Sequence, residues 1–570
     1  MSKAKAARAL RQIERLKLSY GPADSQRKQE LLRALERTAL GNASQVVRLH
    51  EILCFLRAYP DDAELLARVE ALLGDFAHRR DLGRHREDLD SSGIAGTWIS
   101  YSFYWFTALW LARRWPDLFH IDWDSFEQQE LLSSRLAVLM SFSETLALEE
   151  VRFETREWVE KLKASDETDA AFVVRRFAGI PTSPFWREQI FEELDVPCRL
   201  EPGPSTPNRS HARWPESPVV YQRQALETSR DAFPGALKRP PLAVRSVGER
   251  KAQALIDLAR GAMITRSRDL DVFVHADRRD VRLMDCGRGL QFACYGTIPE
   301  RRQMLDAVYG FLILKNGVPI GYFLASALYR SALVAYNIFD TYRGAEAAYV
   351  YGRALAMVRH VFEVDSFGIE TYQLGHHNPE ALESGAWWFY HKLGFRPRDP
   401  DVLRLVAAEV RKLEKNPRHR SSIATLEKLA AVEMYLQRTS EPRDDIVGLI
   451  ARENVGLRLS RYLAERFGAD RERGIRVCAA EAAELLGVRS RSRFTSGERL
   501  AWNRWAPLVL ILPRVRRWSK SSKAGLVEII KAKGGRRESD FVVLFDRHPT
   551  LRRAILELAR DAPSGGSDAD

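Results

Sequence analysis

One apolar segment constrains the fold of this 570-residue chain more than any other, namely YGFLILKNGVPIGYFLASAL at residues 309–328. It consists of two apolar runs that are joined by Asn316 and Gly317. A two-residue hairpin turn needs positive φ at both central positions, and Asn and Gly adopt this conformation most easily. The segment therefore predicts an antiparallel β-hairpin, and SALVAYNIFD at 331–340 predicts a further strand.

The residues around the hairpin alternate between strand-like and helix-like patterns. Strands are favoured by GLQFACYG at 289–296 and by FGIETYQLG at 367–375. Helical spacing of apolar residues occurs at 343–363 and at 383–395. We therefore predict for 245–400 an α/β (α+β) domain that is built around one mostly antiparallel sheet.

The regions on either side of this central domain have a different character. Apolar residues repeat at intervals of three and four, which predicts largely α-helical N- and C-terminal regions. Eleven prolines favour an extended connection before the central domain. Near the C-terminus, FVVLFD at 541–546 predicts a late strand and LRRAILELAR at 551–560 a helix. The expected divisions are a helical domain at 1–180, a Pro-rich connection at 181–244, the central domain at 245–400, a charged helical region at 401–485, a basic region at 486–562 and a disordered tail at 563–570.

The positive charge of the chain is concentrated in one segment. Lys and Arg number 88 and Asp and Glu 76, so the net charge is +12. Residues 488–537 contain 14 basic residues and only Glu498 and Glu528 as acidic ones, which accounts for the whole excess. Arginine beside aromatic residues such as Trp502 and Trp518 suits the binding of phosphates and bases, so nucleic acid is a candidate partner. The alternative is a solvated face, or an internal partner for the acidic helices before it.

The cysteines and the apolar segments bear on the cellular compartment. The five cysteines are scattered without a CxxC pair, which favours a reducing, cytoplasmic environment. The N-terminus has no apolar signal core. The aromatic segment at 91–112 contains about 15 apolar residues where a membrane span needs about 20. We therefore expect a buried helix at 91–112 and no membrane span.

Two segments of the central domain resemble the GNAT acyltransferase superfamily, and the resemblance covers roughly 280–398. The first is YNIFDTYRGAEAA at 336–348. It is similar to a strand whose backbone pairs with the pantetheine arm of acyl-CoA, followed by a turn whose amides hold the pyrophosphate at a helix N-terminus. Glu346 stands where the superfamily has a glycine. The resemblance implies that acyl-CoA is bound by Ile338, Phe339, Arg343, Gly344, Ala345, Ala348 and, from the second segment, Asn378.

The second segment, YQLGHHNPEALESGAWWFYHKLGFR at 372–396, resembles the closing helix and turn of the superfamily. The matching positions are Ala386, Tyr390, Gly394 and Phe395. The resemblance implies that Tyr390 is the general acid that protonates the CoA thiolate. A phenol suits this role because its ordinary pKa of about 10 keeps it protonated at neutral pH.

A general base is also needed, because the acceptor amine must lose a proton. Asp340 ends the strand beside which the thioester would lie, and we expect it to be this base. His376 and His377, which follow the next predicted strand, are alternatives. Adjacent residues on a strand point to opposite faces, and no third ligand has suitable spacing, so we expect no metal.

The expected function is therefore the transfer of an acyl group, most simply acetyl, from acyl-CoA to an amine acceptor of unknown size. Two alternatives stay open. The GNAT-like domain could use another donor, such as an aminoacyl-tRNA, or be catalytically inactive. The chain could instead be a nucleic-acid-binding or scaffold protein that acts through 488–537. The long flanking regions also leave a homo-oligomer open.

Overall fold

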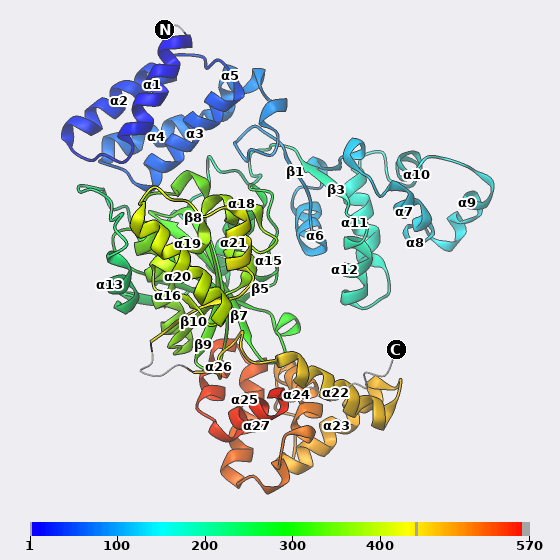
Figure 1. Ribbon diagram of the computed structural model, residues 1–570. Coiled ribbons are helices and arrows are strands. Elements are labelled where there is room, and N and C mark those ends of the chain that lie inside the picture. The colour runs from blue at the N-terminus through cyan, green and yellow to red at the C-terminus, as the bar shows by residue number, and fades with distance from the viewer. Residues whose placement is uncertain (1–2, 439–442, 561–570) are drawn as a thin grey trace. The chain divides into compact units, whose positions relative to one another are not determined.

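The computed structural model describes residues 3–438 and 443–560 of the chain (Figure 1). These residues form two compact units, each assembled from separate stretches of sequence. Unit 1 consists of Met1–Leu226, Ala254–Val274 and Leu314–Ile320, and unit 2 of Glu227–Gln253, His275–Ile313 and Gly321–Asp570. The disordered tail predicted at 563–570 lies outside the described residues.

Unit 1 begins with helices that bury leucine and isoleucine side chains in one core. The side chain of Asp62 accepts a hydrogen bond from the Leu65 amide at 2.8 Å and so caps one of these helices, which fixes the start of that helix. The prediction of helices in this region is confirmed. The helices are α1 (Lys3–Leu16), α2 (Pro22–Glu36), α3 (Ala43–Ala58), α4 (Ala63–Gly74) and α5 (Arg80–Arg84).

The rest of unit 1 packs helices around a small antiparallel sheet with the strand order β1-β3-β2. The helix predicted at 91–112 is partly wrong, because Ile99–Ser102 forms strand β1 and pairs with β3. The helix begins only at Trp105, where the aromatic side chains turn into the core. The elements are β1 (Ile99–Ser102), β2 (Phe119–Ile121), β3 (Pro197–Leu200), α6 (Trp105–Arg114), α7 (Gln129–Ser134), α8 (Leu136–Leu139), α9 (Leu146–Glu150), α10 (Thr155–Leu162), α11 (Asp169–Gly179), α12 (Pro184–Glu192) and α15 (Asp271–Val274).

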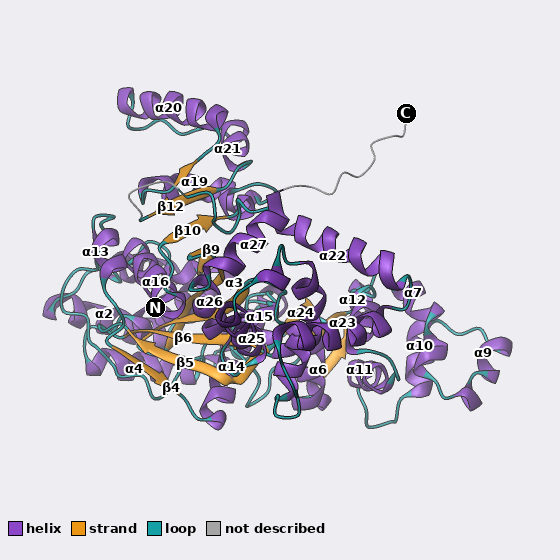
Figure 2. Ribbon diagram, turned by 90° about the horizontal axis from the view of Figure 1, so that it is seen from below, coloured by secondary structure: helices purple, strands orange, loops and turns teal. Residues whose placement is uncertain are grey.

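Unit 2 is built on a nine-stranded sheet with the order β11-β12-β10-β9-β8-β7-β6-β5-β4 (Figure 2). Strands β9 and β10 run parallel, whereas the pairs β4–β5, β5–β6, β8–β9, β10–β12 and β11–β12 are antiparallel. The predicted mostly antiparallel sheet is therefore present. Its strands are β4 (Ala243–Ser246), β5 (Ala276–Asp285), β6 (Leu290–Thr297), β7 (Ala307–Lys315), β8 (Val318–Leu328), β9 (Ser331–Ile338), β10 (Ser366–Ile369), β11 (Arg396–Pro397) and β12 (Met434–Gln437).

The hairpin β7–β8 forms at the predicted turn, where φ is 51° at Asn316 and 81° at Gly317. The strand predicted at 367–375 is shorter than expected: β10 ends at Ile369, and α17 (Thr371–Leu374) follows. Helix α16 (Ala347–Phe362) connects β9 to β10. This order of strand, helix and parallel strand is the connection that a parallel pair requires.

Strands β9 and β10 separate soon after they meet. Three residue pairs join them, and the last is Leu333 with Gly368. Strand β9 nevertheless stays paired with β8 up to Ile338. Because β10 ends at Ile369 and the chain turns into α17, residues 334–338 lose their neighbour on that side. The sheet is thus open between two of its inner strands.

The remaining helices of unit 2 complete the fold. The strand predicted at 541–546 is wrong, because these residues lie in α26, where Phe541, Val542 and Phe545 share one buried face. The spacing of four residues between the two phenylalanines is helical. The helices are α13 (Ala232–Lys238), α14 (Glu249–Ile264, which continues into unit 1), α18 (Pro379–Ser384), α19 (Ala386–Lys392), α20 (Pro400–Lys415), α21 (Ile423–Ala430), α22 (Arg452–Phe467), α23 (Arg471–Leu486), α24 (Ser496–Ile511), α25 (Lys520–Gly534), α26 (Glu538–Asp546) and α27 (Pro549–Arg560).

Candidate functional site

A pocket of about 410 Å³ lies at the point where β9 and β10 separate. We call it the β9–β10 pocket. Leu333, from the last pair of the two strands, forms part of its wall. The other lining residues come from the end of β10, from the residue before β12 and from the start of α22: Glu370, Thr371, Tyr372, Glu433, Gly448, Leu449, Ile450, Ala451, Arg452 and Glu453.

Glu433 is the most unusual group in this pocket. Its carboxylate accepts a hydrogen bond from the Tyr435 hydroxyl. Burial raises the pKa of Glu433 above its ordinary value, and the nearby charge of Glu370 raises it further, although the Tyr435 hydrogen bond acts in the opposite direction. A carboxylate with a raised pKa binds a proton more readily than an ordinary one.

The backbone around Glu433 is arranged so that the pocket stays open. Gly448 has a φ of 98° and lies directly beside the carboxylate. A Cβ atom at this position would come within 3.0 Å of Tyr435 Oη, 3.1 Å of Glu433 Oε2 and 3.2 Å of the Leu333 side chain. Glycine is therefore the residue that this conformation and this close approach require.

The charge of the pocket is negative. Arg452 is its basic residue, and its guanidinium lies 2.8 Å from the carboxylate of Asp306, which neutralises it. Glu370, Glu433 and Glu453 remain as carboxylates along the wall. A cationic group such as an ammonium ion is the ligand that this arrangement attracts, and Glu433 is placed to accept a proton from it.

The turn after β9 carries the residues that the sequence assigned to pyrophosphate binding. Arg343 already has acidic partners there: its guanidinium lies 2.8 Å from Asp340 and 2.6 Å from Glu380. It also donates to the carbonyl of Ile338 at 3.3 Å. The three side chains are largely exposed, so an anionic ligand would compete with weak surface ion pairs.

The N-terminus of α16, which follows this turn, carries a buried carboxylate where an anion-binding site would have free backbone amides. Glu346 occupies the N-cap position of α16 and is only 4% exposed. Four other predicted cofactor residues, Ile338, Phe339, Ala345 and Ala348, are also buried. Gly344 has a φ of 84° and no heavy atom within 4 Å of a Cβ built on it, so its side of the turn is open.

Tyr390 lies on the other side of the sheet from the β9–β10 pocket. Its ring packs against Tyr351 of α16 and against Phe395, with centroids 5.7 Å and 5.8 Å away. It also lies close enough to Tyr336 for its charge to affect the pKa of that phenol. Tyr336 and Leu333 are three positions apart on β9, so their side chains point to opposite faces. Burial raises the pKa of Tyr390, which keeps its hydroxyl protonated.

The remaining predicted residues stabilise turns or lie at the surface. Asn378 caps α18, because its side chain accepts from the Ala381 amide at 3.2 Å and donates to the Tyr372 carbonyl at 3.1 Å. Asp340 is 82% exposed and paired with Arg343. The rings of His376 and His377 contact each other at a tilt of 54°, with their centroids 4.0 Å apart. Within 3–438 and 443–560, no group of three acidic, His or Cys side chains could hold a metal ion.

Sequence reasoning missed Glu433 and Glu370, the carboxylates of the pocket. No motif surrounds Glu433, and it lies in a region predicted to be entirely helical. Only the alternation MYLQ of β12 after it could have indicated a short strand. The pairing of that strand with β10 is what brings the carboxylate to the opening.

Comparison with known proteins gives no match: no family model, no curated protein and no solved structure is similar to this chain. In the described part of the chain, no helix is both long and apolar enough to span a membrane. All five cysteines are buried free thiols.

Proposed function

We propose that unit 2 is an N-acyltransferase of the GNAT type, which transfers an acyl group from acyl-CoA to an amine. The observation that carries this proposal is the separation of β9 and β10 beside a pocket that contains a carboxylate with a raised pKa. The backbone of 334–337, which has no partner on β10, can then pair with the pantetheine arm, as the resemblance implies. The acceptor amine enters from the face of the sheet that carries Glu433.

The reaction requires one proton acceptor and one proton donor. The amine nitrogen attacks the thioester carbonyl carbon, so a C–N bond forms and the C–S bond breaks. Glu433 takes the proton that the amine loses, directly or through one water molecule. Tyr390 gives its proton to the departing thiolate from the opposite face and regains one from solvent. Asp340, the base expected from the sequence, is replaced in this scheme because it is exposed and paired with Arg343.

The test is a measurement of free thiol release from acetyl-CoA in the presence of a panel of amines. We expect Glu433→Gln and Tyr390→Phe each to reduce kcat by about 10²-fold or more, since each removes one proton transfer. Glu414→Gln, on the exposed side of α20, is the matched control and should keep full activity. Absence of both CoA binding at millimolar ligand and thiol release would overturn the proposal.

A different donor is the second candidate, and the buried Glu346 favours it. A carboxylate at the start of α16 repels a pyrophosphate, whereas the ester end of an aminoacyl-tRNA brings no pyrophosphate to this position. CoA binding by wild-type chain would exclude this alternative. Gain of CoA binding only in Glu346→Gly would support it.

We further propose a cytoplasmic location. The free thiols at all five cysteines support a reducing compartment.

A further inference from the structure

The basic segment 488–537 divides into residues that hold the fold together and residues that face solvent. Eight of its 14 basic side chains contact other groups of unit 2. These contacts involve carbonyls for Arg499, Arg504, Lys523 and Arg536, a hydroxyl for Arg537, and carboxylates for Arg514, Lys531 and Lys533. Only Lys533 of these eight is buried, but all eight already have a partner within the fold.

The other six form two clusters at the two ends of α24. Arg489, Arg491 and Arg493 precede the helix, and we call them the 489–493 cluster. Arg516, Arg517 and Lys520 follow it and form the 516–520 cluster. None of the six makes an ion pair within the described residues; Arg516 only lies near Glu481, which is itself paired with Arg466. Five are exposed and Arg491 is half-buried.

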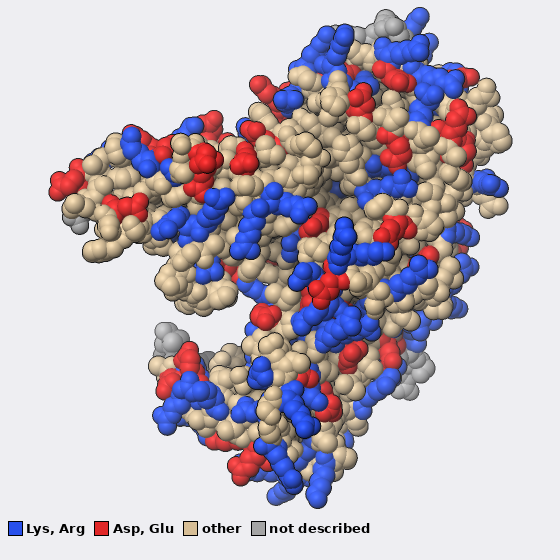
Figure 3. All heavy atoms as spheres, turned by 180° about the vertical axis from the view of Figure 1, so that it is seen from behind, with Lys and Arg blue, Asp and Glu red and all other residues tan. Residues whose placement is uncertain are grey.

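Figure 3 shows many Lys and Arg side chains over the lower part of the molecule, where the C-terminal helices lie, with Asp and Glu interspersed among them. Such a surface has a positive potential and attracts polyanions. Helix α24 has 16 residues and is about 24 Å long, and one cluster precedes its first residue while the other follows its last.

Two of the aromatic residues of this segment, Trp502 and Trp505, are not free for stacking on bases. Trp502 and Trp505 are each 1% exposed and belong to the core between the helices. Phe494 packs on Trp502, and Trp518 packs on His548. The sequence-based expectation of base stacking is therefore unsupported at Trp502 and Trp505. What remains for a ligand is charge.

Large apolar side chains are also missing from the exposed surface of 488–537. A peripheral membrane site normally combines basic residues with apolar side chains that enter the lipid. The combination of two separated basic clusters, buried tryptophans and no exposed apolar residue points to the backbone of a nucleic acid. We propose that the 489–493 and 516–520 clusters together bind nucleic acid through its phosphates, without reading its sequence.

The experiment measures fluorescence anisotropy of labelled RNA and of labelled duplex DNA, each about 20 nucleotides or base pairs long, with the full-length chain from 50 to 200 mM KCl. Six phosphate contacts predict a slope of log K against log salt of about −5 on duplex and about −4 on single strands. Preference for one of the two probes would show whether the backbone recognised is that of a duplex or of a single strand.

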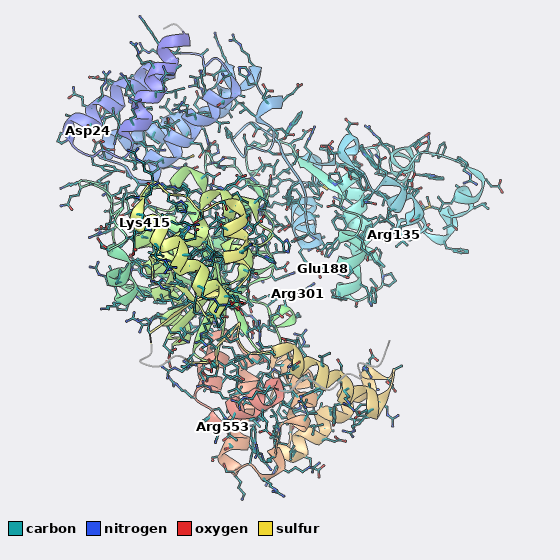
Figure 4. The ribbon with its side chains drawn as sticks, viewed as in Figure 1. Asp24, Arg135, Glu188, Arg301, Lys415 and Arg553 are labelled. Carbon is teal, nitrogen blue, oxygen red and sulfur yellow. The ribbon has the colours of Figure 1, made fainter. Side chains whose placement is uncertain are left out.

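Two triple variants test the two clusters separately: Arg489, Arg491 and Arg493 to Glu, and Arg516, Arg517 and Lys520 to Glu. Each should weaken binding at 50 mM KCl by about tenfold or more and reduce the slope by about two to three. The matched control reverses three exposed charges elsewhere in unit 2, namely Arg411, Lys415 and Arg418 to Glu. Figure 4 shows Lys415, at the end of α20, away from the C-terminal helices that carry Arg553.

All variants should keep the melting temperature of the wild type, since the altered side chains are not part of the core. Unchanged affinity and slope in both cluster variants, or no binding by the wild type at 50 mM KCl, would overturn the proposal. The proposal would also be overturned if the chain sedimented with phosphatidylserine vesicles and bound neither nucleic acid. Equal loss of affinity in the control variant would show that only net charge matters and would overturn the assigned surface.

Discussion

Lys533 and Glu538 form an ion pair in the interior of unit 2, with 2.6 Å between Nζ and Oε1 and no more than 3% of either side chain exposed. Lys533 also donates to the carbonyl of Asp306 at 2.8 Å. Arg302 donates to the carbonyls of Lys533 and Gly535, at 2.6 Å and 2.7 Å. These contacts attach the end of α25 and the start of α26 to the residues that precede β7.

Removal of one member of this pair should destabilise the protein strongly. Lys533→Met leaves the Glu538 carboxylate buried with only the more distant Arg302 guanidinium, 3.9 Å away, as a cation, which costs on the order of 3 kcal/mol. The double variant Lys533→Met with Glu538→Leu removes both charges and should recover most of that loss. Urea unfolding of the three proteins measures the difference. A decrease of less than about 1 kcal/mol in the free energy of unfolding of Lys533→Met would contradict this prediction.

The pH dependence of the proposed reaction should reflect Glu433. A base works when it is deprotonated, so kcat/KM should rise with pH through a pKa above the ordinary carboxyl value of about 4.3. Tyr435→Phe removes a hydrogen bond that lowers the pKa of Glu433, so the acid limb should move to higher pH. The limb should vanish in Glu433→Gln. An identical acid limb in the Tyr435→Phe variant would argue against this assignment.

In the proposed function, Glu380 would compete with CoA for Arg343, because its carboxylate lies 2.6 Å from that guanidinium at an exposed position. An exposed pair of this kind is worth about 0.2–1 kcal/mol. Glu380→Gln should therefore tighten CoA binding about 1.4- to 5-fold at low salt, with no change in stability. Isothermal titration calorimetry measures the dissociation constant for CoA, with Glu414→Gln as the control. Weaker binding in Glu380→Gln would show that Arg343 does not contact the ligand.

Glu51 of unit 1 makes stability depend on pH at the acid end. Burial pushes the pKa of Glu51 upward, but the hydrogen bond from His50 and the charge of Arg209 outweigh burial and lower the pKa to about 2. Its contribution, on the order of 3 kcal/mol, is fully present above the unfolded pKa of about 4.3 and is lost as pH falls toward 2.

This effect can be measured by urea unfolding of unit 1 between pH 6 and pH 3 in the full chain. The wild type should lose stability more steeply than Glu51→Gln, which lacks the titrating group. Parallel curves for the two proteins would show that the native environment of Glu51 does not depress its pKa.

Local sequence signals predicted the centre of the sheet correctly. Asn316 and Gly317 determine the β7–β8 turn through their own backbone preferences, so no distant residue is needed to place it. FVVLFD was wrongly predicted as a strand because its run of apolar residues fits a short strand as well as a buried helix. The segment is helical because a helix places Phe541 and Phe545 together in the interior of unit 2.

The candidate site was less predictable because its parts meet only through the sheet. Arg343 and Tyr390 lie in segments that resemble a known family, and both were proposed from the sequence. Glu433 reaches the opening because β12 lies between β10 and β11 in the sheet. The order of strands in a sheet depends on contacts between distant residues, so local propensity does not predict it. The neutralisation of Arg343 by Glu380 likewise depends on two turns that are brought together in space.

The early separation of β9 from β10 leaves an inner strand with one flank that has no neighbouring strand. Backbone amides of 334–338 that point away from β8 have no partner on β10. Their hydrogens should exchange with solvent deuterium quickly, while those that face β8 exchange slowly. A bound chain that lies along this flank would act as a substitute strand and slow the exchange, so the exchange rate of these amides reports binding without any catalytic turnover.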